Sequence, residues 1–151
     1  MKNIALFPGS FDPYTLGHHD ILLKSLNLFD KIIIAIGSNS NKKRYFDEKV
    51  ILNKTKEIYK EHNKIEIIIY NELTAKLASK YNANFILRGL RNTTDFEFEN
   101  SISQINKHLN HKLETVFLIT SPEFAHISST IIREVHDYGG DINKFLPYIL
   151  R

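Results

Sequence analysis

The chain has no cysteine among its 151 residues. Without thiols it has no disulfide bond, no thiolate nucleophile and no metal site built from thiolates. A chain free of disulfides suits a reducing compartment, and we expect this protein to act in the cytoplasm.

Long apolar stretches are missing as well. No apolar run approaches the length of a membrane-spanning helix, so the sequence predicts no membrane partner. The first ten residues, MKNIALFPGS, hold a short apolar run that Pro8 ends, and they predict no signal peptide.

Several motifs of nucleotide-binding and acyl-transfer enzymes are absent. There is no GxxxxGK[ST] loop, which argues against a Walker-type ATPase or kinase. No GxGxxG follows an apolar run, and there is no GxSxG elbow, so dinucleotide redox chemistry and an acyl nucleophile are both unsupported. The seven histidines do not follow metal-ligand spacing, so the sequence predicts no metal-ligating residues.

Positive charge is only slightly in excess, with a formal net charge of +3. The lysines are interspersed with glutamates, as in NKTKEIYKEHNK, which is typical of a solvated helix face. No segment combines basic and aromatic residues in the way that RNA-binding surfaces do. The charge therefore indicates no nucleic-acid partner.

Short apolar runs and helical patterns alternate along the whole chain. The apolar runs predict strands at residues 3–7, 31–37, 65–70, 84–88 and 115–120. Apolar residues at helical spacing predict helices at residues 18–29, 47–62, 71–82, 94–110 and 128–138. Gly139 and Gly140 end the last helix, and Asp141 caps a short final turn.

Strands that are each followed by a helix predict parallel pairing with right-handed crossovers. Runs such as KIIIAI and IEIIIY are apolar at nearly every position, as strands covered on both faces should be. We therefore expect an α/β fold, a single Rossmann-like doubly wound domain over residues 1–151. Its five-stranded parallel sheet should carry helices on both faces.

The predicted helix at residues 94–110 has the clearest apolar stripe. Phe98, Ile102, Ile105 and Leu109 are spaced i, i+4, i+7 and i+11 and share one helix face. Phe96 and Phe98 are most simply explained as core residues, and not as a platform on which nucleic-acid bases stack.

The loops after the predicted strands carry groups that bind phosphates. In a doubly wound sheet, ligands bind beyond the carboxyl ends of the strands, where the strand order reverses. Four of the five strand ends are followed by glycine, hydroxyl, histidine or basic residues, in PGSFDPYTLGHH, GSNSNKKRYF, RGLRNTTDFE and SPEFAHISST. The sequence therefore predicts a phosphate site along this edge of the sheet.

The loop after the first strand places His18 at the start of the first helix. Helix amino termini attract anions, and a histidine there can donate to a phosphate oxygen. Gly9 and Gly17 let the backbone approach a ligand closely, and Ser10 adds a hydroxyl. Capping or surface exposure would explain His18 alone, but its neighbours favour a phosphate site. His19 is assigned a structural role.

The segment RGLRNTTDFEFE is the densest group of functional side chains. Arg88 is expected to end a strand, Gly89 to free the backbone, and Arg91 to add a second guanidinium. Guanidinium groups bind phosphates through a rigid fork of donors. Asp95 and Glu99 lie four residues apart on one helix face, and an ion pair of Arg91 with Asp95 is the alternative explanation.

The segment ISSTIIRE opens the last predicted helix with three hydroxyl side chains. One of them suffices as an N-cap, so Ser128, Ser129 and Thr130 together suggest a cradle of N–H and O–H donors for a terminal phosphate. Arg133 is either a phosphate contact or an exposed helix charge. Lys42, in SNKKRYF, either reaches an anion or is solvated, and its chemistry alone does not decide.

Taken together, these segments resemble a known family. A G-[ST]-F-D-P strand end, a following T-x-G-H and a later I-S-S-[ST] are similar to the nucleotidyltransferase superfamily with the (H/T)xGH signature. Within it, PGSFDPYTLGH, RGLRNTTDFEFE and ISSTIIRE resemble the family of bacterial phosphopantetheine adenylyltransferases. The resemblance covers almost the whole chain, and RGLRNTTDFEFE is its most specific part.

The resemblance implies transfer of the adenylyl group of ATP to 4'-phosphopantetheine, which yields dephospho-coenzyme A and pyrophosphate. It also implies Mg²⁺ as the cofactor, a homohexamer, and feedback inhibition by coenzyme A. The acceptor phosphate is already anionic, so positioned cations and helix termini suffice without a general base. The alternatives are an adenylyltransferase for nicotinamide mononucleotide, a cytidylyltransferase for a polyol phosphate, and a non-catalytic nucleotide sensor.

The resemblance further implies a role for each site residue. The expected catalytic residues are His18, Lys42, Arg88 and Arg91. The expected acceptor-binding residues are Ser10, Lys42, Thr74 and Arg88. The expected ATP-binding residues are Gly9, Ser10, Phe11, Gly17, His18, Arg88, Gly89, Leu90, Arg91, Glu99, Phe124, Ala125, His126, Ile127, Ser128, Ser129 and Thr130. Thr74, Phe124 and His126 depart from the residues usual in the family.

Overall fold

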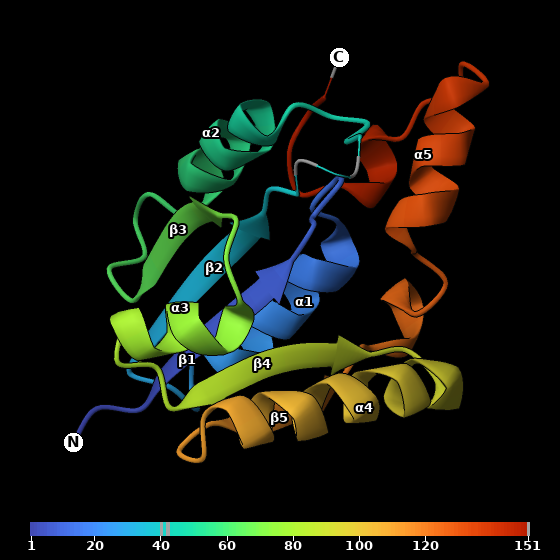
Figure 1. Cartoon of the computed structure of the whole chain (residues 1–151). Coiled ribbons are helices and arrows are strands. Elements are labelled where there is room, and N and C mark those ends of the chain that lie inside the picture. The colour runs from blue at the N-terminus through green and yellow to red at the C-terminus, as the bar shows by residue number, and fades with distance from the viewer. Residues whose placement is uncertain (40, 42, 151) are drawn as a thin grey trace.

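The computed structural model describes residues 1–39, 41 and 43–150. Its centre is a five-stranded sheet in the order β3-β2-β1-β4-β5, in which every neighbouring pair is parallel (Figure 1). The strands are β1 (Ile4–Gly9), β2 (Lys31–Gly37), β3 (Ile65–Tyr70), β4 (Phe85–Leu90) and β5 (Glu114–Ile119). The predicted α/β fold with a parallel sheet is confirmed.

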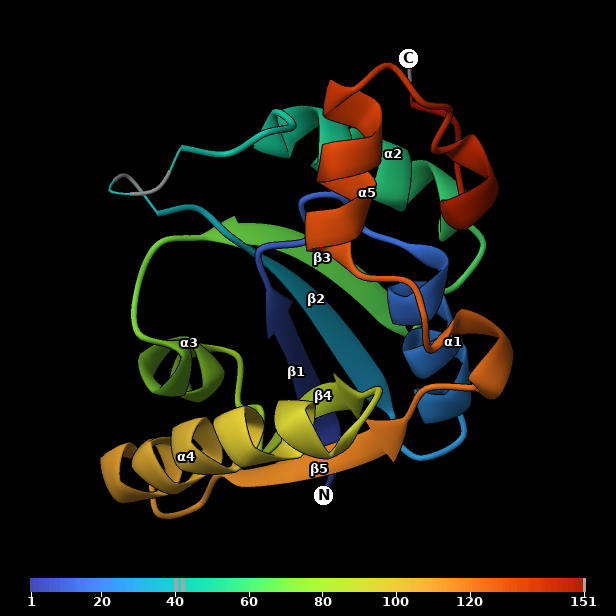
Figure 2. The same cartoon turned by 90° about the vertical axis from the view of Figure 1, so that its right-hand side faces the viewer.

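Helices cover both faces of the sheet. They are α1 (Leu16–Ser25), α2 (Glu48–Ile58), α3 (Thr74–Lys80), α4 (Thr93–Leu109) and α5 (Ser129–Asp137), with single 3-10 turns η1 (Pro122–Phe124) and η2 (Asn143–Phe145). Figures 1 and 2 show α1 and α2 on one side of the sheet and α3 and α4 on the other. Across the described ranges, no helix combines the length and the apolar character that a bilayer crossing needs.

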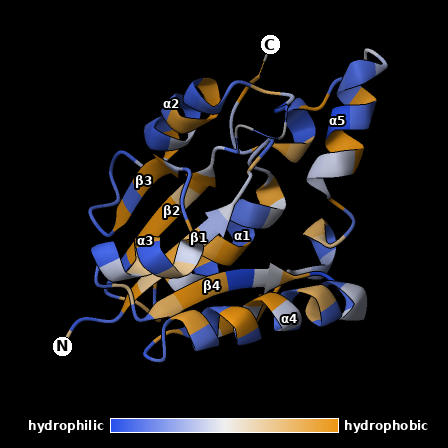
Figure 3. Cartoon of the chain, viewed as in Figure 1, coloured by the Kyte–Doolittle hydropathy of each residue, from blue (hydrophilic) through white to orange (hydrophobic). Residues whose placement is uncertain are grey.

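The sheet separates two hydrophobic clusters, one on each face. On β2, Ile32, Ile34 and Ile36 belong to the cluster beneath α1 and α2, whereas Ile33 and Ala35 belong to the cluster beneath α3. All five side chains are fully buried. A strand covered on both faces gains from an apolar side chain at every position, which explains the run KIIIAI and the hydrophobic colour of β2 (Figure 3).

The strand order reverses between β1 and β4. From β1 the chain moves through β2 to β3, and it then returns to β4 on the other side of β1. The ladder between β1 and β4 holds only the pairs Ala5–Phe85 and Leu6–Ile86, near the amino ends of the two strands. Their carboxyl ends therefore leave a crevice, the place where doubly wound sheets bind ligands.

Two boundaries differ from the prediction at this crevice. β4 continues through Arg88 and Gly89 to Leu90, so the expectation that Arg88 ends a strand was wrong. β1 likewise continues through Pro8 to Gly9. A proline is tolerated in a strand where no ladder bond needs its N–H, and the ladder with β4 stops before Pro8.

Gly89 is required for packing, and not for the backbone freedom that was expected. A Cβ atom at this position would lie 2.7 Å from Cγ1 of Ile21 on α1. Ile21 is 2% exposed and cannot retreat without disturbing the core. The missing side chain of Gly89 therefore lets α1 lie directly on β4.

Most of the apolar stripe of α4 faces outward, and Ile102, at its edge, also lines a cavity. The exposed fractions along the stripe are 67% for Phe98, 40% for Ile102, 62% for Ile105 and 55% for Leu109. The expectation that Phe98 is a core residue was wrong, and Phe96 is half exposed although its ring contacts Phe117. The buried residues of α4 are Glu99 and Asn106. The polar face of α4 is turned inward because it forms one wall of a cavity.

Candidate active site

Two cavities open at the crevice between β1 and β4, and they meet there. The larger, of about 640 Å³, lies between the sheet and the inward face of α4 and extends to Tyr70 and Thr74. The smaller, of about 370 Å³, lies at the amino ends of α1 and α5. Ser10, Arg88 and Glu99 line both cavities. The crevice thus offers two binding sites with a shared boundary.

His18 lies in the first turn of α1 and lines the smaller cavity. The N–H of Thr15 donates to Nδ1 of the imidazole over 2.9 Å, and the hydroxyl of Thr15 accepts from the N–H of His18 over 3.4 Å. This is a capping box in which histidine replaces the usual Glu or Gln. Because Nδ1 accepts a hydrogen bond, a neutral His18 carries its proton on Nε2.

The surroundings of His18 keep its ring neutral. The ring contacts those of Phe11 and Tyr14, with centroids 4.9 and 5.3 Å away. Burial, followed by the charges of Arg88 and Arg91, lowers the pKa of His18 from 6.5 to about 3. At neutral pH the side chain is therefore a neutral donor, suited to an oxygen on which negative charge develops.

His19 is turned to the interior of the α1 side. Its Nδ1 lies 2.7 Å from the hydroxyl of Tyr59, which in turn lies 2.6 Å from the hydroxyl of Tyr14. Tyr14 is the residue that backs the ring of His18. These contacts agree with the structural role predicted for His19.

Arg88 is held by a carboxylate from the opposite wall of the crevice. Its Nε donates to one oxygen of Glu99 over 2.8 Å and its Nη2 to the other over 2.5 Å. Its Nη1 donates to the carbonyl oxygen of Pro8. Among the described residues these groups engage three of the five guanidinium donors, so two can serve a ligand at the boundary of the cavities.

Arg91 is fixed in a similar way at the start of α4. Asp95 accepts from the backbone N–H, Nε and Nη2 of Arg91 over 2.9, 3.1 and 3.2 Å. The ion pair considered as the alternative explanation is therefore present. Both residues line the smaller cavity, so the pair still presents a guanidinium to it. Asn92 caps α4 by accepting from the N–H of Asp95.

The hydroxyl side chains at the start of α5 have partners inside the protein. Ser128 is the N-cap and accepts from the N–H of Ile131 over 3.2 Å. Ser129 donates to a carbonyl oxygen in the loop before α1 over 2.9 Å, and Thr130 accepts from Arg133 over 3.3 Å. Only Ser129 uses its O–H proton in these bonds, so the O–H groups of Ser128 and Thr130, with the backbone N–H groups of the first turn of α5, are the donors that the predicted cradle can offer.

The segment after β5 is fastened to α1. The carboxylate of Asp20 accepts from the N–H and from the hydroxyl of Ser121, each over 2.9 Å. Residues 127–130, at the end of this segment, line the smaller cavity. Residues 124–126 line neither cavity, and the ring of His126 contacts a phenylalanine near the carboxyl terminus. Their contact with ATP stays a prediction.

Gly9 and Phe11 shape the loop after β1. Phe11 has a φ of 45°, in the left-handed region, and its side chain is 3% exposed. A Cβ atom at Gly9 would lie 3.0 to 3.2 Å from three ring carbons of Phe11, so glycine fits beneath the ring. Phe11 lines neither cavity, and its contact with ATP stays a prediction, which its buried ring limits to the backbone.

The other predicted residues are divided between the cavities and their surroundings. Thr74 begins α3 and lines the larger cavity, where its hydroxyl lies 3.1 Å from that of Tyr70. Gly17 lines the smaller cavity, and Leu90 lines neither. Lys42 lies outside the described residues, so its contact with the acceptor stays a prediction.

Several residues that line the cavities were not predicted, among them Thr15, Ser103 and Asn106. Thr15 orients His18, and the T-x-G-H spacing of a capping box is the sequence signal that identifies it. Ser103 and Asn106 line the larger cavity from α4. Together with Glu99 they are spaced i, i+4 and i+7, so a polar stripe was visible opposite the apolar one.

Metal-ligating groups do not gather at the site. Within residues 1–39, 41 and 43–150, no three His, Asp or Glu side chains are placed to hold a metal ion. The carboxylates that line the smaller cavity, Asp95 and Glu99, are paired with Arg91 and Arg88. A metal ion at this site would take most of its oxygen ligands from a bound phosphate chain and from water.

The fold and the two joined cavities define a nucleotidyltransferase of the α/β type, and the model of the Cytidylyltransferase-like family matches residues 6–135. The chain is 55% identical over 148 residues to a phosphopantetheine adenylyltransferase of Cytophaga hutchinsonii, and the alignment covers 98% of this chain and 99% of that protein. It is 48% identical over 147 residues to a phosphopantetheine adenylyltransferase of Flavobacterium johnsoniae, and the alignment covers 97% of this chain and 96% of that protein. The chain belongs to the phosphopantetheine adenylyltransferase family.

A solved structure shows how widely the fold is shared. The bifunctional NMN adenylyltransferase/ADP ribose pyrophosphatase from Francisella tularensis matches with a TM-score of 0.73 at 14% identity, over 97% of this chain and 45% of that one. At such low identity the likeness establishes the fold alone. The predicted family membership therefore rests on the relatives of high identity.

Proposed function

We propose that this chain transfers the adenylyl group of ATP to 4'-phosphopantetheine, with dephospho-coenzyme A and pyrophosphate as products. The observation that carries the proposal is the pair of cavities that meet at Ser10 and Arg88. A transfer between two substrates needs the attacking oxygen and the α-phosphorus at one boundary. The relatives at 55% and 48% identity bear the name of this activity.

The nucleotide is assigned to the smaller cavity and the acceptor to the larger. The smaller cavity combines the amino ends of α1 and α5 with His18 and Arg91, which suits a triphosphate. The larger runs from Arg88 along α4 to Asn106. Its mixture of apolar and amide-bearing side chains suits a long arm that contains amide groups and ends in a phosphate.

The acceptor phosphate supplies the nucleophile. One of its oxygens already carries negative charge at neutral pH, so no side chain has to remove a proton. This oxygen attacks the α-phosphorus in line, and the bond from the α-phosphorus to the bridging oxygen of the β-phosphate breaks. Pyrophosphate leaves with that oxygen and its electron pair.

The protein contributes donors that act on the charge of the transition state. Nε2–H of His18 donates to an α-phosphoryl oxygen, and Arg88 and Arg91 supply positive charge nearby. Ser10 and Arg88, with Lys42, hold the acceptor phosphate. Because Arg88 and Arg91 are already fixed by carboxylates, little reorganisation is needed when the substrates bind.

We further propose that Mg²⁺ accompanies ATP. The described residues offer no cage of carboxylates for it, so the triphosphate oxygens would be its main ligands. When bound there, the ion neutralises part of the triphosphate charge. Titration of ATP with and without Mg²⁺ tests this assignment, and equal turnover in the presence of a chelator would overturn it.

A homo-oligomer, with the hexamer that the family resemblance implies, is also proposed. The outward stripe of α4 supports it, because each large apolar side chain removed from water is worth about 1.5–3 kcal/mol. The outward stripe residues are Phe98, Ile105 and Leu109, with Ile102 between this surface and the larger cavity. Exposed apolar stripes of this kind mark interaction surfaces, and a second copy of the chain is the partner that a homo-oligomer provides.

Coenzyme A is proposed as a feedback inhibitor. It combines the pantetheine arm of the acceptor with an adenine nucleotide, so one molecule can enter both cavities. Inhibition should then be competitive with both substrates, and a pattern non-competitive with both would argue for a separate site.

A cytoplasmic location is proposed because ATP is the co-substrate.

The proposed activity is tested by pyrophosphate release from MgATP with three acceptors: 4'-phosphopantetheine, nicotinamide mononucleotide and glycerol 3-phosphate. Release with phosphopantetheine alone supports the proposal. Release with either of the other two instead would overturn the assignment of the acceptor. If ATP bound without release in any mixture, a nucleotide sensor would be the better explanation.

A further inference from the structure

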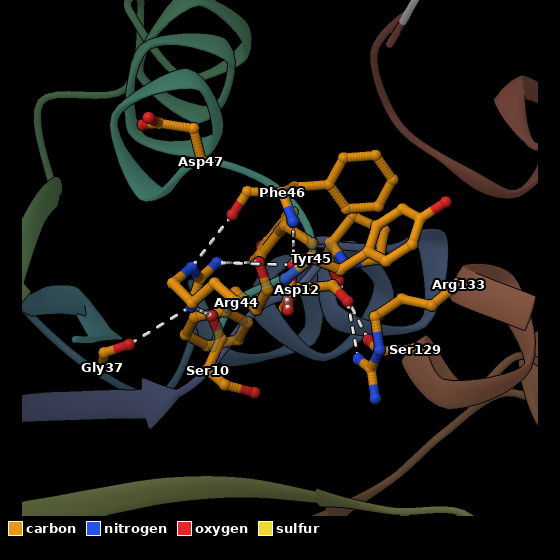
Figure 4. A network of polar contacts seen from close by, with 12 residues as sticks. Ser10, Asp12, Gly37, Arg44, Tyr45, Phe46, Asp47, Ser129 and Arg133 are labelled. Atoms are coloured by element: carbon orange, nitrogen blue, oxygen red, sulfur yellow. Dashed lines mark hydrogen bonds and ion pairs between the residues drawn. The ribbon is translucent and has the colours of Figure 1, made fainter. Parts of the chain in front are cut away.

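Arg44 has no role in the function described so far, although it lies beside the crevice. It belongs to the loop between β2 and α2, and its side chain is 14% exposed. Figure 4 shows that its guanidinium points into a cluster of backbone groups. Arg44 is therefore a charged side chain that is mostly removed from solvent, which is uncommon for arginine unless the side chain is paired.

All three guanidinium nitrogens of Arg44 donate hydrogen bonds to the protein backbone. Nη1 donates to the carbonyl oxygens of Ser10 over 2.5 Å and Gly37 over 3.2 Å. Nη2 donates to the carbonyl oxygen of Phe11 over 3.2 Å and lies 3.8 Å from the carboxylate of Asp12. Nε donates to the carbonyl oxygen of Phe46 over 3.1 Å. Four of the five guanidinium N–H donors thus bind backbone carbonyls, and the Asp12 carboxylate is an ion-pair partner, so the group mainly binds the protein itself.

These contacts fix the direction of one peptide group at the site. The peptide between Ser10 and Phe11 is trans, so the Ser10 carbonyl and the Phe11 N–H point to opposite sides. Since the carbonyl is bound to Arg44, the N–H of Phe11 points away from Arg44. In Figure 4 the hydroxyl of Ser10 also points away from the guanidinium, and Ser10 lines both cavities.

The conformation that Arg44 holds is an unusual one. Phe11 has a φ of 45°, which is unfavourable for a residue with a side chain. Hydrogen bonds from a charged donor are stronger than those between neutral groups. Arg44 makes such bonds to the carbonyl of Ser10, which precedes Phe11, and to the carbonyl of Phe11 itself. Arg44 thus stabilises a turn that the local sequence does not favour.

A reciprocal contact ties the same two loops together. The carboxylate of Asp12, from the loop after β1, accepts from the N–H groups of Tyr45 and Phe46 over 2.9 and 2.8 Å. Arg133 of α5 donates to the carbonyl oxygen of Asp12 over 2.7 Å. The loop after β1 is therefore held on three sides, and Arg44 is the only one of these residues that binds Ser10 in the part of the chain described.

We propose that Arg44 is a positioning residue for adenylyl transfer, which orients the Ser10–Phe11 peptide so that the Phe11 N–H and the Ser10 hydroxyl face the phosphates at the boundary of the cavities. The inference rests on the proposed function for the identity of the acceptor. The expected effect of Arg44 on ATP binding does not depend on which acceptor is used, because the Ser10–Phe11 peptide would contact the nucleotide directly.

The test compares Arg44→Gly and Arg44→Lys with the wild type and with Lys43→Met. MgATP affinity is measured by calorimetry, and kcat and KM for ATP are measured with phosphopantetheine. Misplacing the loop should lower kcat/KM for ATP about 10- to 100-fold and weaken MgATP binding in parallel. Arg44→Lys should be nearly as impaired, because one ammonium group cannot replace a planar fork that binds carbonyls of the loop after β1, the end of β2 and the segment before α2. Lys43 is exposed, and removing its charge should change these values less than about twofold.

Addition of ethylguanidinium to Arg44→Gly separates positioning from folding. Partial recovery of MgATP affinity with ethylguanidinium, and not with ethylammonium, supports the inference. Should the Gly variant fail to fold, Arg44→Lys carries the comparison. The inference is overturned if folded variants bind MgATP and turn over within about twofold of the wild type, or if neither compound restores a lost affinity. A wild type that binds MgATP but releases no pyrophosphate would overturn the proposed function alone, and the calorimetry would still test Arg44.

Discussion

α1 and α4 contact the same two strands, β4 and β5, from opposite faces, and they do so in opposite ways. α1 buries Ile21 and Leu22, at 2% and 0% exposure, and presses Ile21 against the bare backbone of Gly89. α4 turns Glu99 and Asn106 toward the sheet and leaves Phe98, Ile105 and Leu109 in solvent. One face of β4 packs on α1 and borders the smaller cavity only around Gly89, whereas the other face borders the larger cavity of about 640 Å³.

The contrast shows how one sheet combines rigidity with a binding site. Close packing under α1 fixes the backbone that carries His18, which suits a group that must be positioned accurately. The polar face of α4 lines space that a ligand can fill, and its apolar face is left for another protein surface. Each of the following changes alters one side of this arrangement, in order from the largest consequence to the smallest.

Replacing His18, the hydrogen-bond donor at the amino end of α1, should lower activity the most. His18→Ala removes a neutral hydrogen-bond donor aimed at the transition state, which should lower kcat about 10²- to 10³-fold. The rate of pyrophosphate release with saturating substrates measures this. His111→Ala, in an exposed turn, is the matched control and should keep full activity. A His18→Ala enzyme with more than a tenth of the wild-type kcat would contradict the role of the α1 face.

Charging the outer face of α4 should separate the subunits without unfolding them. Phe98→Glu combined with Ile105→Glu places two carboxylates where apolar contact is proposed, at sites that are 67% and 62% exposed in one chain. Sedimentation equilibrium should give a smaller species than the wild type at the same concentration. Lys54→Glu, on the exposed surface of α2, should leave the mass unchanged. A wild type that sediments as a single chain would remove the basis of this prediction.

Filling the bare backbone of β4 should loosen α1. In Gly89→Ala the new Cβ would lie 2.7 Å from Ile21. We expect destabilisation by about 1–3 kcal/mol, together with a loss of activity, because the same helix carries His18. Chemical denaturation and turnover measure the two effects. Ile21→Ala removes the opposing atoms, so in the double variant the two changes should be non-additive by about 1 kcal/mol or more. Strict additivity would argue against the contact.

Changing the inner face of α4 should affect the acceptor alone. Asn106→Leu removes an amide from the wall of the larger cavity, and a lost hydrogen bond of about 0.5–1.5 kcal/mol raises KM for phosphopantetheine severalfold. The KM for ATP and kcat should change little. Ser101→Ala, on the exposed side of α4, is the control. An equal rise in both KM values would contradict the division of substrates between the cavities.

The ring of His18 should show no response to pH in the neutral range. Its pKa is lowered to about 3 in the folded protein, whereas an unfolded chain takes up the proton near 6.5. Falling pH between these values therefore favours the unfolded state, and the ring itself stays neutral. Nitrogen NMR of the imidazole should show a protonated Nε2 and an accepting Nδ1 from pH 8 to pH 5. A shift of both nitrogens near pH 6.5 would contradict this.

The sheet could be predicted from the sequence because burial on both faces leaves a direct trace. β2 and β3 are apolar at almost every position, and their observed bounds equal the predicted ones. The cap of His18 was also within reach, because Thr15 lies three residues away in the same turn. Signals that lie within one element can be recognised without knowing the tertiary structure.

What could not be predicted depends on how distant segments meet. A helical stripe shows which residues of α4 share a face, but not whether that face points inward, which is why Phe98 was misplaced. Arg44 and Ser10 are 34 residues apart, and nothing in SNKKRYF distinguishes a backbone clamp from a solvated charge. The roles of Lys42 and of residues 124–126, and the single domain over residues 1–151, stay predictions.

The transfer reaction is tested most directly in a single turnover, with enzyme in excess and phosphopantetheine whose phosphate oxygens are labelled with ¹⁸O. Direct attack on the α-phosphorus predicts dephospho-coenzyme A that retains all of the label and pyrophosphate that contains none. Mass spectrometry measures the label in dephospho-coenzyme A and in pyrophosphate, and mass spectrometry of the protein detects any attached adenylyl group. Label in pyrophosphate, or an adenylyl group on the protein before the acceptor is added, would contradict direct transfer at the boundary of the two cavities.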